Sequence, residues 1–286
     1  MAIINGSKAQ VLVDALPYIQ KYSGGIVVIK YGGNAMTNDE LKNAVMSDIV
    51  LLTQVGIRVV LVHGGGPEIT QMFEKLGKET KFIDGLRYTD KESISIVQMV
   101  LAGKVNKNLV MNIQNQGGHA IGLCGIDSNI IKAVKKSGEV DYGYVGEISS
   151  INVAPIIDAL KNGYIPVIAT IASGEDGEVY NINADTAASQ LAAAVAARNL
   201  ILMTDIKGLM RDPSDETTLI PHVKVDEIQQ LIDSGVISGG MLPKISCCID
   251  AVENGVGQTT IIDGRVLHSV LIEILSNEGV GTLISK

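Results

Sequence analysis

The 286-residue chain has no tryptophan, two phenylalanines and eight tyrosines, so aromatic side chains supply little of any core that it builds. Hydrophobic residues nevertheless make up 46% of the sequence, and most of them are aliphatic. This proportion supplies a large buried core and excludes a disordered chain, a coiled coil and a collagen-like fibre. The length suits one large α/β domain or two tightly joined halves.

Cysteine is also scarce, since Cys124, Cys247 and Cys248 are the three in the chain. An odd number without a Cys-x-x-Cys pair argues against both a disulfide framework and a zinc site, and it fits a reducing cytoplasm. The first 22 residues include Lys8 and Asp14 and contain no continuous apolar run. They predict neither a signal peptide nor a membrane span, so we expect no membrane partner.

Basic residues are fewer than acidic ones, since the chain has 23 lysines and arginines against 31 aspartates and glutamates, and the formal net charge is −8. The chain has no run of basic residues. Nucleic acids and anionic membrane surfaces are therefore not expected as partners. An anionic ligand would need a local cationic pocket.

Two continuously apolar runs, 26–30 and 59–63, each lead into a glycine-rich turn. Such runs are typical of buried parallel strands, and further strands and helices alternate after them. Strands are expected at 120–124, 129–134, 165–169, 178–182, 200–204, 259–263 and 281–285, with 129–134 beginning a surface hairpin. Helices are expected at 39–54, 68–76, 91–116, 153–161, 184–198, 225–233, 242–253 and 267–275.

This alternation predicts an α/β fold, with a three-layer αβα sandwich around a mainly parallel twisted sheet and ligands at the carboxyl ends of its strands. No linker separates the halves, so 1–286 is expected to be a single domain. Residues 9–22 have helical spacing, and Pro17 in the interior predicts a kink.

The glycines Gly64, Gly65 and Gly66 follow a strand and precede Pro67 at the start of a helix. Their backbone N–H groups and the helix amino end can bind an anion without side chains in the way, although a tight turn alone also explains them. The chain has neither a Walker A loop nor a Gly-x-Gly-x-x-Gly fingerprint, so the usual nucleotide motifs do not account for these glycines.

Two lysines stand at glycine-flanked positions. Lys30 ends an apolar strand, and Lys244 follows Gly239 and Gly240 near a helix start. Two cations so placed suit phosphoryl transfer, in which catalysis is mainly positioning and charge neutralisation. A strand-end lysine that reaches solvent explains Lys30 equally well.

Other polar residues lie at the expected ligand edge. Asn181, Asn183 and Asp185 precede or begin an alanine-rich helix, where capping explains one of them, while Asp185 can orient the two lysines and an asparagine amide can bind a carboxylate. Arg87 can clamp a carboxylate, although a lone loop arginine is usually solvated. Residues 205–210 follow a strand and can hold a nucleotide or form a capped turn.

The motifs taken together in chain order resemble the amino acid kinase family. They are Lys30-Tyr31-Gly32-Gly33-Asn34-Ala35-Met36, His63-Gly64-Gly65-Gly66-Pro67, Gly85-Leu86-Arg87, Asn181-Ile182-Asn183-Ala184-Asp185, Thr204-Asp205-Ile206-Lys207-Gly208 and Gly239-Gly240-Met241 to Lys244. The resemblance implies transfer of the ATP γ-phosphoryl group to the side-chain carboxylate of N-acetyl-L-glutamate in arginine biosynthesis. A carboxylate is already ionised at neutral pH, so the absence of a recognisable general base is consistent with this chemistry.

By position, the resemblance implies that Lys30 and Lys244 stabilise the transferring group while Asp185 holds them. It assigns the amino-acid substrate to a half at about 24–180, and the substrate-binding residues are Gly65, Gly66, Arg87 and Asn181. It assigns ATP to a half at about 181–286, with Mg²⁺ held mainly by the ATP phosphates and no metal site in the protein. The implied nucleotide-binding residues are Asp205, Ile206, Lys207, Gly208, Leu209, Met210, Val236, Ile237 and Ser238.

The resemblance also implies regulation. A kinked helix within 1–23 is similar to one that joins dimers into a hexamer in arginine-inhibited members, so a homodimer, or a hexamer as a trimer of dimers, is expected. The implied arginine site comprises Lys21, His268, Glu278 and Gly279. Whether a PII-type signalling protein binds is left open.

Three alternatives stay open at this stage. The first is a kinase for another amino-dicarboxylate, and the second is a non-catalytic arginine or amino-acid sensor on the same fold. The third is a dinucleotide-dependent oxidoreductase, against which the missing Rossmann fingerprint counts.

Overall fold

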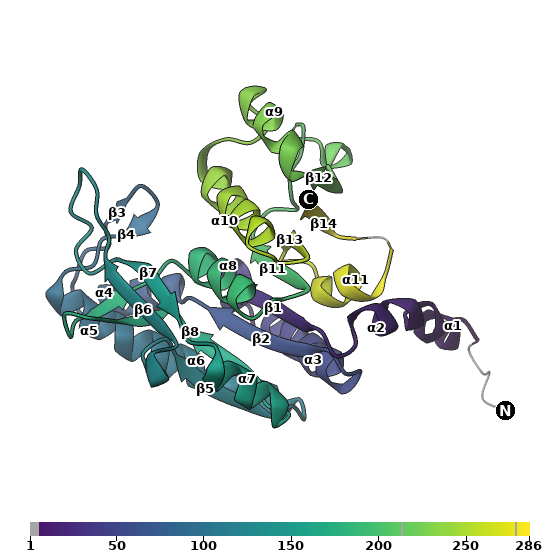
Figure 1. The fold of residues 1–286 in the computed structure, drawn as a ribbon, viewed down its shortest axis with the longest axis horizontal. Helices are drawn as coiled ribbons and strands as arrows, with labels where there is room; N and C mark the ends of the chain where they lie inside the picture. The colour runs from purple at the N-terminus through teal and green to yellow at the C-terminus, as the bar shows by residue number, and fades with distance from the viewer. Residues whose placement is uncertain (1–5, 213, 278) are drawn as a thin grey trace.

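The computed structural model describes residues 6–212, 214–277 and 279–286. In this part of the chain, eight strands form one sheet in the order β12-β14-β13-β11-β1-β2-β8-β5 (Figure 1). Neighbouring strands pair in parallel, except β13 with β14. The strands are β1 (Ile26–Tyr31), β2 (Arg58–His63), β5 (Ala120–Cys124), β8 (Ile165–Ala169), β11 (Asn199–Thr204), β12 (His222–Lys224), β13 (Gln258–Asp263) and β14 (Gly281–Ser285). The predicted mainly parallel sheet is confirmed.

Helices cover both faces of this sheet (Figure 1). Successive side chains of β1 point to opposite faces, so Val27 and Ile29 join one core while Val28 joins the other. The first face carries α3 (Asp39–Gln54), α6 (Asn106–Asn115) and α11 (Ser269–Leu275), and the second carries α7 (Ala154–Lys161), α8 (Ala184–Ala194) and α10 (Leu242–Glu253). The three-layer αβα prediction is therefore confirmed.

A smaller sheet continues from the carboxyl end of β8, because Thr170 alone separates β8 from β9 (Ile171–Gly174). Its order is β10-β9-β6-β7, and β6 (Ile131–Lys135) pairs antiparallel with β7 (Gly146–Ile151), as the predicted hairpin requires. The remaining strands are β10 (Val179–Asn181) and the hairpin of β3 (Phe82–Ile83) with β4 (Leu86–Arg87).

The expected helix at 91–116 is helical throughout, but it is not one α-helix. It runs as α5 (Lys91–Gln98), a π-helical segment (Met99–Val105) and α6. Beyond the amino-terminal helices, the other α-helices of the described residues are α4 (Gly66–Lys75) and α9 (Ile228–Asp233), and short 3₁₀ turns lie at Gly33–Met36, Asp127–Asn129, Glu216–Thr218, Val225–Glu227 and Gly239–Met241. None of the described helices is long and apolar enough to cross a bilayer.

The kinked amino-terminal helix is two helices, α1 (Gly6–Asp14) and α2 (Leu16–Tyr22). The prediction of a kink is confirmed, but the stated position of Pro17 is wrong. Pro17 lies in the first turn of α2, where its missing N–H has no intrahelical partner to lose, and the break is at Ala15. In Figure 1 this helix pair lies at the opposite end of the molecule from the β3–β4 hairpin.

Candidate active site

The glycine loop joins the carboxyl end of β2 to α4, next to the carboxyl end of β1. Gly65 caps α4, and no side chain caps the free N–H groups of that helix end. A Cβ on Gly65 would lie 2.6 Å from Cδ2 of Leu101 and 3.2 Å from Cγ2 of Val105, both in the π-helical segment. The segment therefore packs directly on the loop backbone, and glycine is needed for this close approach.

The side chain of Arg87, on β4, is buried against this loop and is not solvated. Its Nη2 donates to the Gly66 carbonyl oxygen at 2.9 Å and to Oγ1 of Thr70 at 2.8 Å. The guanidinium also lies over the rings of Phe73 and Phe82, at 5.5 and 4.8 Å from their centroids. Burial lowers the pKa of Arg87, but an arginine keeps its charge at any physiological pH.

A cavity of about 190 Å³ opens beside the loop and brings together all four predicted substrate residues, Gly65, Gly66, Arg87 and Asn181. Asn181 lies on β10 and donates from Nδ2 to Oγ1 of Thr89 at 3.4 Å. The rest of the lining is largely apolar, and among the described residues it includes no aspartate or glutamate.

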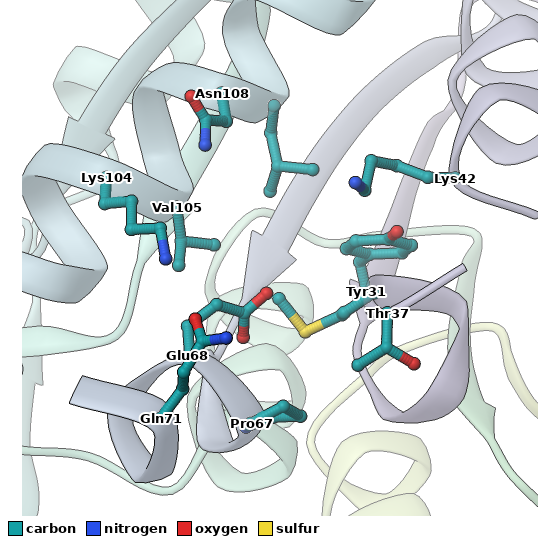
Figure 2. A pocket seen from close by; sticks show the side chains of 11 residues that line it. Tyr31, Thr37, Lys42, Pro67, Glu68, Gln71, Lys104, Val105 and Asn108 are labelled. Carbon is teal, nitrogen blue, oxygen red and sulfur yellow. The ribbon is translucent and has the colours of Figure 1, made fainter. Parts of the chain in front are cut away.

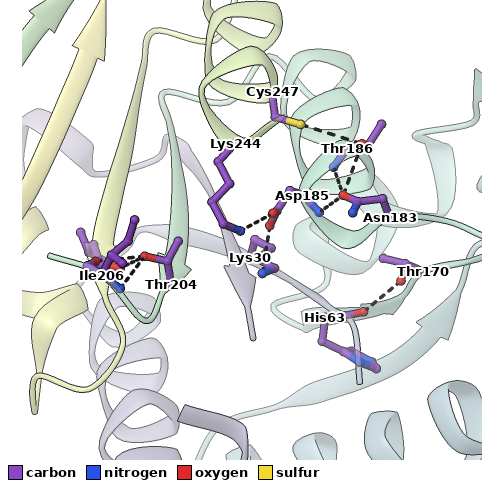
Figure 3. A network of polar contacts seen from close by, with 11 residues as sticks. Lys30, His63, Thr170, Asn183, Asp185, Thr186, Thr204, Ile206, Lys244 and Cys247 are labelled. Atoms are coloured by element: carbon purple, nitrogen blue, oxygen red, sulfur yellow. Dashed lines mark hydrogen bonds and ion pairs between the residues drawn. The ribbon is translucent and has the colours of Figure 1, made fainter. Parts of the chain in front are cut away.

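The two predicted catalytic lysines meet on Asp185 (Figure 3). Nζ of Lys30 lies 2.9 Å from Oδ1, and Nζ of Lys244 lies 2.7 Å from Oδ2. Burial alone would raise the pKa of Asp185, but the charges and hydrogen bonds of the two lysines outweigh it and lower the value to about 2. The carboxylate is therefore ionised and held between two cations.

Within the Asn181–Asp185 motif, Asn183 caps a helix and Asp185 contacts the two lysines. Oδ1 of Asn183 accepts from the backbone N–H groups of Asp185 and Thr186, at 2.9 and 3.1 Å, and so caps α8. This cap places Asp185 in the first helical turn. Its neighbour Ala184 lines the substrate cavity, whereas Asp185 itself lines a separate cavity of about 860 Å³.

Both lysines line a second cavity, which has a volume of about 450 Å³. In the described part of the chain its lining includes Lys30, Lys244, Asp205 and Ile206, but none of the other seven predicted nucleotide residues. The predicted nucleotide residues did not include Met203, which lies next to a quoted motif on β11, or Thr204 and Met241, which lie within quoted motifs.

The other predicted nucleotide residues have different surroundings. Nζ of Lys207 lies 2.5 Å from Oε2 of Glu216, and the N–H of Leu209 donates to Oγ1 of Thr282 at 2.8 Å. A Cβ on Gly208 would lie 2.6 Å from the same Thr282 oxygen. Met210 forms an isolated antiparallel β-bridge with Leu219. Residues 236–238 precede the 3₁₀ turn that begins at Gly239.

The implied arginine site is partly assembled. Lys21 and Gly279 line a cavity of about 240 Å³ together with Glu273, whose pKa burial raises. His268 is not in its lining, since Nδ1 of His268 lies 2.5 Å from Oδ1 of the buried Asp48. Glu278 falls outside the described residues.

A further cavity, of about 340 Å³, lies between α4 and the π-helical segment, and no predicted site residue lines it. Figure 2 shows Lys104, Asn108 and Gln71 around it, with Glu68 below and Tyr31 opposite. Among the described residues, no three His, Cys, Asp or Glu side chains cluster as a metal site.

Comparison with known proteins assigns the chain to a family. Residues 25–263 match the model of the amino acid kinase family. The chain belongs to the amino acid kinase family. It is 54% identical over 284 residues to an acetylglutamate kinase of Brachyspira hyodysenteriae, covering 99% of both chains, and 56% identical over 276 residues to one of Clostridium kluyveri, covering 96% of this chain and 98% of the other.

Solved structures of the family share the fold. A Neisseria gonorrhoeae N-acetylglutamate synthase in complex with coenzyme A and N-acetylglutamate matches with a TM-score of 0.84 at 26% identity. That match covers 97% of this chain but 63% of the synthase, so this chain spans less than two thirds of the synthase. A Giardia lamblia carbamate kinase bound to AMP-PNP matches with a TM-score of 0.66 at 18% identity, over 93% of this chain and 99% of that one.

Proposed function

We propose that this member of the amino acid kinase family transfers the γ-phosphoryl group of ATP to the side-chain carboxylate of N-acetyl-L-glutamate. The products are N-acetyl-L-glutamyl 5-phosphate and ADP, in a step of arginine biosynthesis. The observation that carries the proposal is the Lys30–Asp185–Lys244 cluster, whose lysines line one cavity and whose aspartate directly follows Ala184 in the lining of the other. The relatives named acetylglutamate kinase support the choice of reaction.

The substrate cavity supports an acylated amino acid. Arg87 offers a buried cation to a carboxylate, while the described lining has no acidic side chain to pair with the free ammonium group of glutamate. An acetylated nitrogen is neutral, so it can lie against apolar lining residues such as Val145 and Ile182 without a counter-charge.

In the proposed reaction, a carboxylate oxygen of the substrate forms a bond to the γ-phosphorus as the bond from that phosphorus to the ADP oxygen breaks. The substrate carboxyl is ionised at neutral pH, so no protein base is required. Lys30 and Lys244 neutralise charge on the transferring group, and the N–H groups of Gly65 and Gly66 donate to its oxygens. Asp185 keeps the two ammonium groups close together despite their mutual repulsion.

The donor set fits a nucleotide that brings its own Mg²⁺. Both carboxylate oxygens of Asp185 face lysines, which leaves that side chain poorly placed to bind a metal. Lys30 and Lys244 instead present positive charge to phosphate oxygens in the second cavity. Mg²⁺ on the phosphates would supply further neutralisation of their charge.

The proposal extends to regulation and location. Arginine is proposed to bind the cavity lined by Lys21, Glu273 and Gly279, with its guanidinium at Glu273, and to inhibit turnover. Arginine titration of the activity tests this, and Glu273→Gln should abolish the inhibition. Cys124, Cys247 and Cys248 are free thiols, which supports a cytoplasmic enzyme.

The test of the main proposal is an assay with MgATP and N-acetyl-L-glutamate in which hydroxylamine traps the acyl phosphate as a hydroxamate. We expect ATP-dependent hydroxamate with the wild-type chain and at least a hundredfold less with Asp185→Ala, in line with the loss of transition-state electrostatics. A wild-type chain that is folded but forms no hydroxamate from this substrate would refute the proposal.

A further inference from the structure

The buried imidazole of His63, at the end of β2, is not used by the proposed reaction, yet it contacts the glycine loop directly. Its Nδ1 lies 2.9 Å from the carbonyl oxygen of Gly64, and its Nε2 lies 3.1 Å from Nδ2 of Asn106. Asn106 is the first residue of α6 and is itself buried. Figure 3 shows His63 beside the substrate edge of the sheet, near Thr170.

The surroundings of Asn106 determine which end of its amide faces the ring. Its Nδ2 also lies 3.1 Å from the carbonyl oxygen of Leu123 and 2.9 Å from that of Val167, and both oxygens can only accept hydrogen bonds. Its Oδ1 accepts from Nζ of Lys107 at 3.1 Å. The atom that faces His63 is therefore an N–H donor.

This contact determines the tautomer of His63. The Gly64 carbonyl oxygen can only accept a hydrogen bond and Nδ2 of Asn106 can only donate one, so the single proton of the neutral ring is on Nδ1 and Nε2 carries none. His63 therefore donates to the Gly64 carbonyl oxygen. Burial, together with the charge of Lys107, lowers the pKa of His63 to about 4, so the neutral ring persists at physiological pH.

The Gly64 carbonyl and the Gly65 N–H belong to one trans peptide and point in opposite directions. A donor fixed on the carbonyl side therefore directs the Gly65 N–H away from His63, and Gly65 itself lines the substrate cavity. Hydrogen bonding at the carbonyl also polarises the peptide and strengthens its N–H as a donor. We infer that His63 is a positioning residue that aims the Gly65 N–H at the transferring phosphoryl group, an inference that rests on the proposed function.

Neighbouring carbonyls of the loop are held in the same way. Oγ1 of Thr170 donates to the His63 carbonyl oxygen at 3.4 Å, and Arg87 holds that of Gly66 at 2.9 Å. Side chains thus bind the loop through its carbonyl groups, while no hydrogen bond within the described residues occupies the N–H groups of Gly65 and Gly66. This is the preorganisation that an oxyanion site requires.

The test compares two amide variants of similar polarity. In His63→Asn the side-chain amide reaches the position of Nδ1 and can still donate to Gly64, whereas in His63→Gln it reaches the position of Nε2 and cannot. We expect His63→Gln to lower kcat by about 10- to 100-fold, with KM for both substrates within about threefold, and His63→Asn to recover most of that loss. Equal kcat in two variants of equal thermal stability, or a change in KM alone, would overturn the inference.

A second measurement needs no activity. Two-bond ¹H–¹⁵N spectra of the ¹⁵N-histidine-labelled wild-type chain report the tautomer of each ring, and the signals missing from His63→Asn identify His63. A proton on Nδ1 from about pH 5 to 9 supports the inference. A proton on Nε2, or a charged ring, overturns it whether or not N-acetylglutamate is the substrate.

These outcomes separate the two proposals. If the wild-type chain phosphorylates another acceptor and not N-acetylglutamate, the proposed function fails, and the two variants are then compared on that acceptor. If the wild-type chain phosphorylates N-acetylglutamate and the variants do not differ, the role of His63 fails alone.

Discussion

The charges of Lys30 and Lys244 are the residue-level basis of the proposed chemistry. We expect Lys30→Met and Lys244→Met each to lower kcat by roughly 100- to 1,000-fold, because each removes a cation aimed at the phosphoryl group. The matched control is Lys161→Met, which removes an exposed lysine from the last turn of α7 and should keep wild-type turnover. Steady-state kinetics that show near-wild-type turnover in both site variants would refute their assigned role.

Asp185 links the same cluster to pH-dependent stability. Its pKa is lowered from 3.8 to about 2 on folding, so its ionised form stabilises the native state above pH 3.8, and this stabilisation is lost as the pH falls toward 2. The contribution is about 2 kcal/mol at neutral pH, and about half of it remains at pH 3.

Urea unfolding of the wild type and Asp185→Asn at pH 7 and pH 3 measures this contribution. The wild-type advantage should shrink by about 1 kcal/mol at the lower pH. An advantage that is constant or larger at pH 3 would contradict the lysine-held carboxylate.

Arg87 is expected to bind substrate before and during transfer, so Arg87→Ala should raise KM for N-acetylglutamate, by roughly 10- to 100-fold for a lost charged hydrogen bond. Arg58→Ala, at the exposed start of β2, is the control and should leave KM unchanged. A variant of Arg87 with normal KM and lost turnover would show that the residue acts mainly through the Gly66 carbonyl.

Individual site residues were predictable where a motif marks them. The motifs identified Lys30, Lys244, Asp185 and the four residues now found in one cavity. The motif that contains His63 gave no sign of its role, because its partner Asn106 lies 43 positions away and no local pattern pairs them. The hydrogen bond from the Leu209 N–H to Thr282 was not predictable for the same reason, since the two residues are far apart in the sequence.

At the level of elements, the π-helical segment packs on the glycine loop and leaves room for a side chain at Gly66 but not at Gly65. A Cβ on Gly65 would meet Leu101 at 2.6 Å, whereas a Cβ on Gly66 would meet nothing within 4 Å. Gly65→Ala should therefore lower the free energy of unfolding by about 1–3 kcal/mol, and Gly66→Ala by less than about 1 kcal/mol.

Chemical denaturation of both variants tests this, with Gly65→Ala/Leu101→Ala as the check on the cause. Removing the leucine methyl groups should make the alanine at 65 less costly than in the wild-type background. Equal destabilisation by the two single alanine variants would contradict the packing account.

Elements were predictable to the extent that burial determines their sequence. The all-apolar strands β1, β2 and β11 were predicted because both of their sides are covered. The strand β7 was not, because its partly exposed sequence alternates weakly, and short β9 and β12 carry too few residues for a pattern. A π-helical turn has the same composition as an α-helical one, so the segment at 99–105 had no sequence signal.

At the scale of the whole molecule, the amino-terminal helix has an apolar surface with no partner in the described chain. Val11, Leu12 and Val13 are 66%, 74% and 59% exposed in α1. Such residues gain stability by burial against another copy. The resemblance to arginine-inhibited members implies that this copy belongs to a second dimer, and on that ground we propose a hexamer in which α1 joins three dimers.

The double substitution Val11→Glu and Leu12→Glu should convert this hexamer to dimers, because it places charges in the helix contact without touching the core. Sedimentation velocity measures the change, and Gln10→Glu is the control at an exposed polar position of the same helix. A wild-type chain that sediments as a dimer, or a double variant that remains hexameric, would contradict the role of α1.

The global charge and the local charge of this molecule have opposite signs. A net charge of −8 argued against extended anionic partners, while folding places Lys30 near the carboxyl end of β1, Lys244 in the first turn of α10 and Arg87 on β4, each in the lining of a cavity. The composition could not show this placement, because it depends on the parallel sheet that brings residues 30, 63 and 204 to one edge.

The central claim is that this site phosphorylates an acylated amino-dicarboxylate, and the most direct measurement is kcat/KM with MgATP across a panel of acceptors. The panel is N-acetyl-L-glutamate, L-glutamate, L-aspartate, carbamate and UMP. Because the described cavity lining lacks a counter-charge for an ammonium group, kcat/KM for N-acetyl-L-glutamate should exceed that for L-glutamate by at least about 100-fold. A higher kcat/KM for any other acceptor would contradict the account.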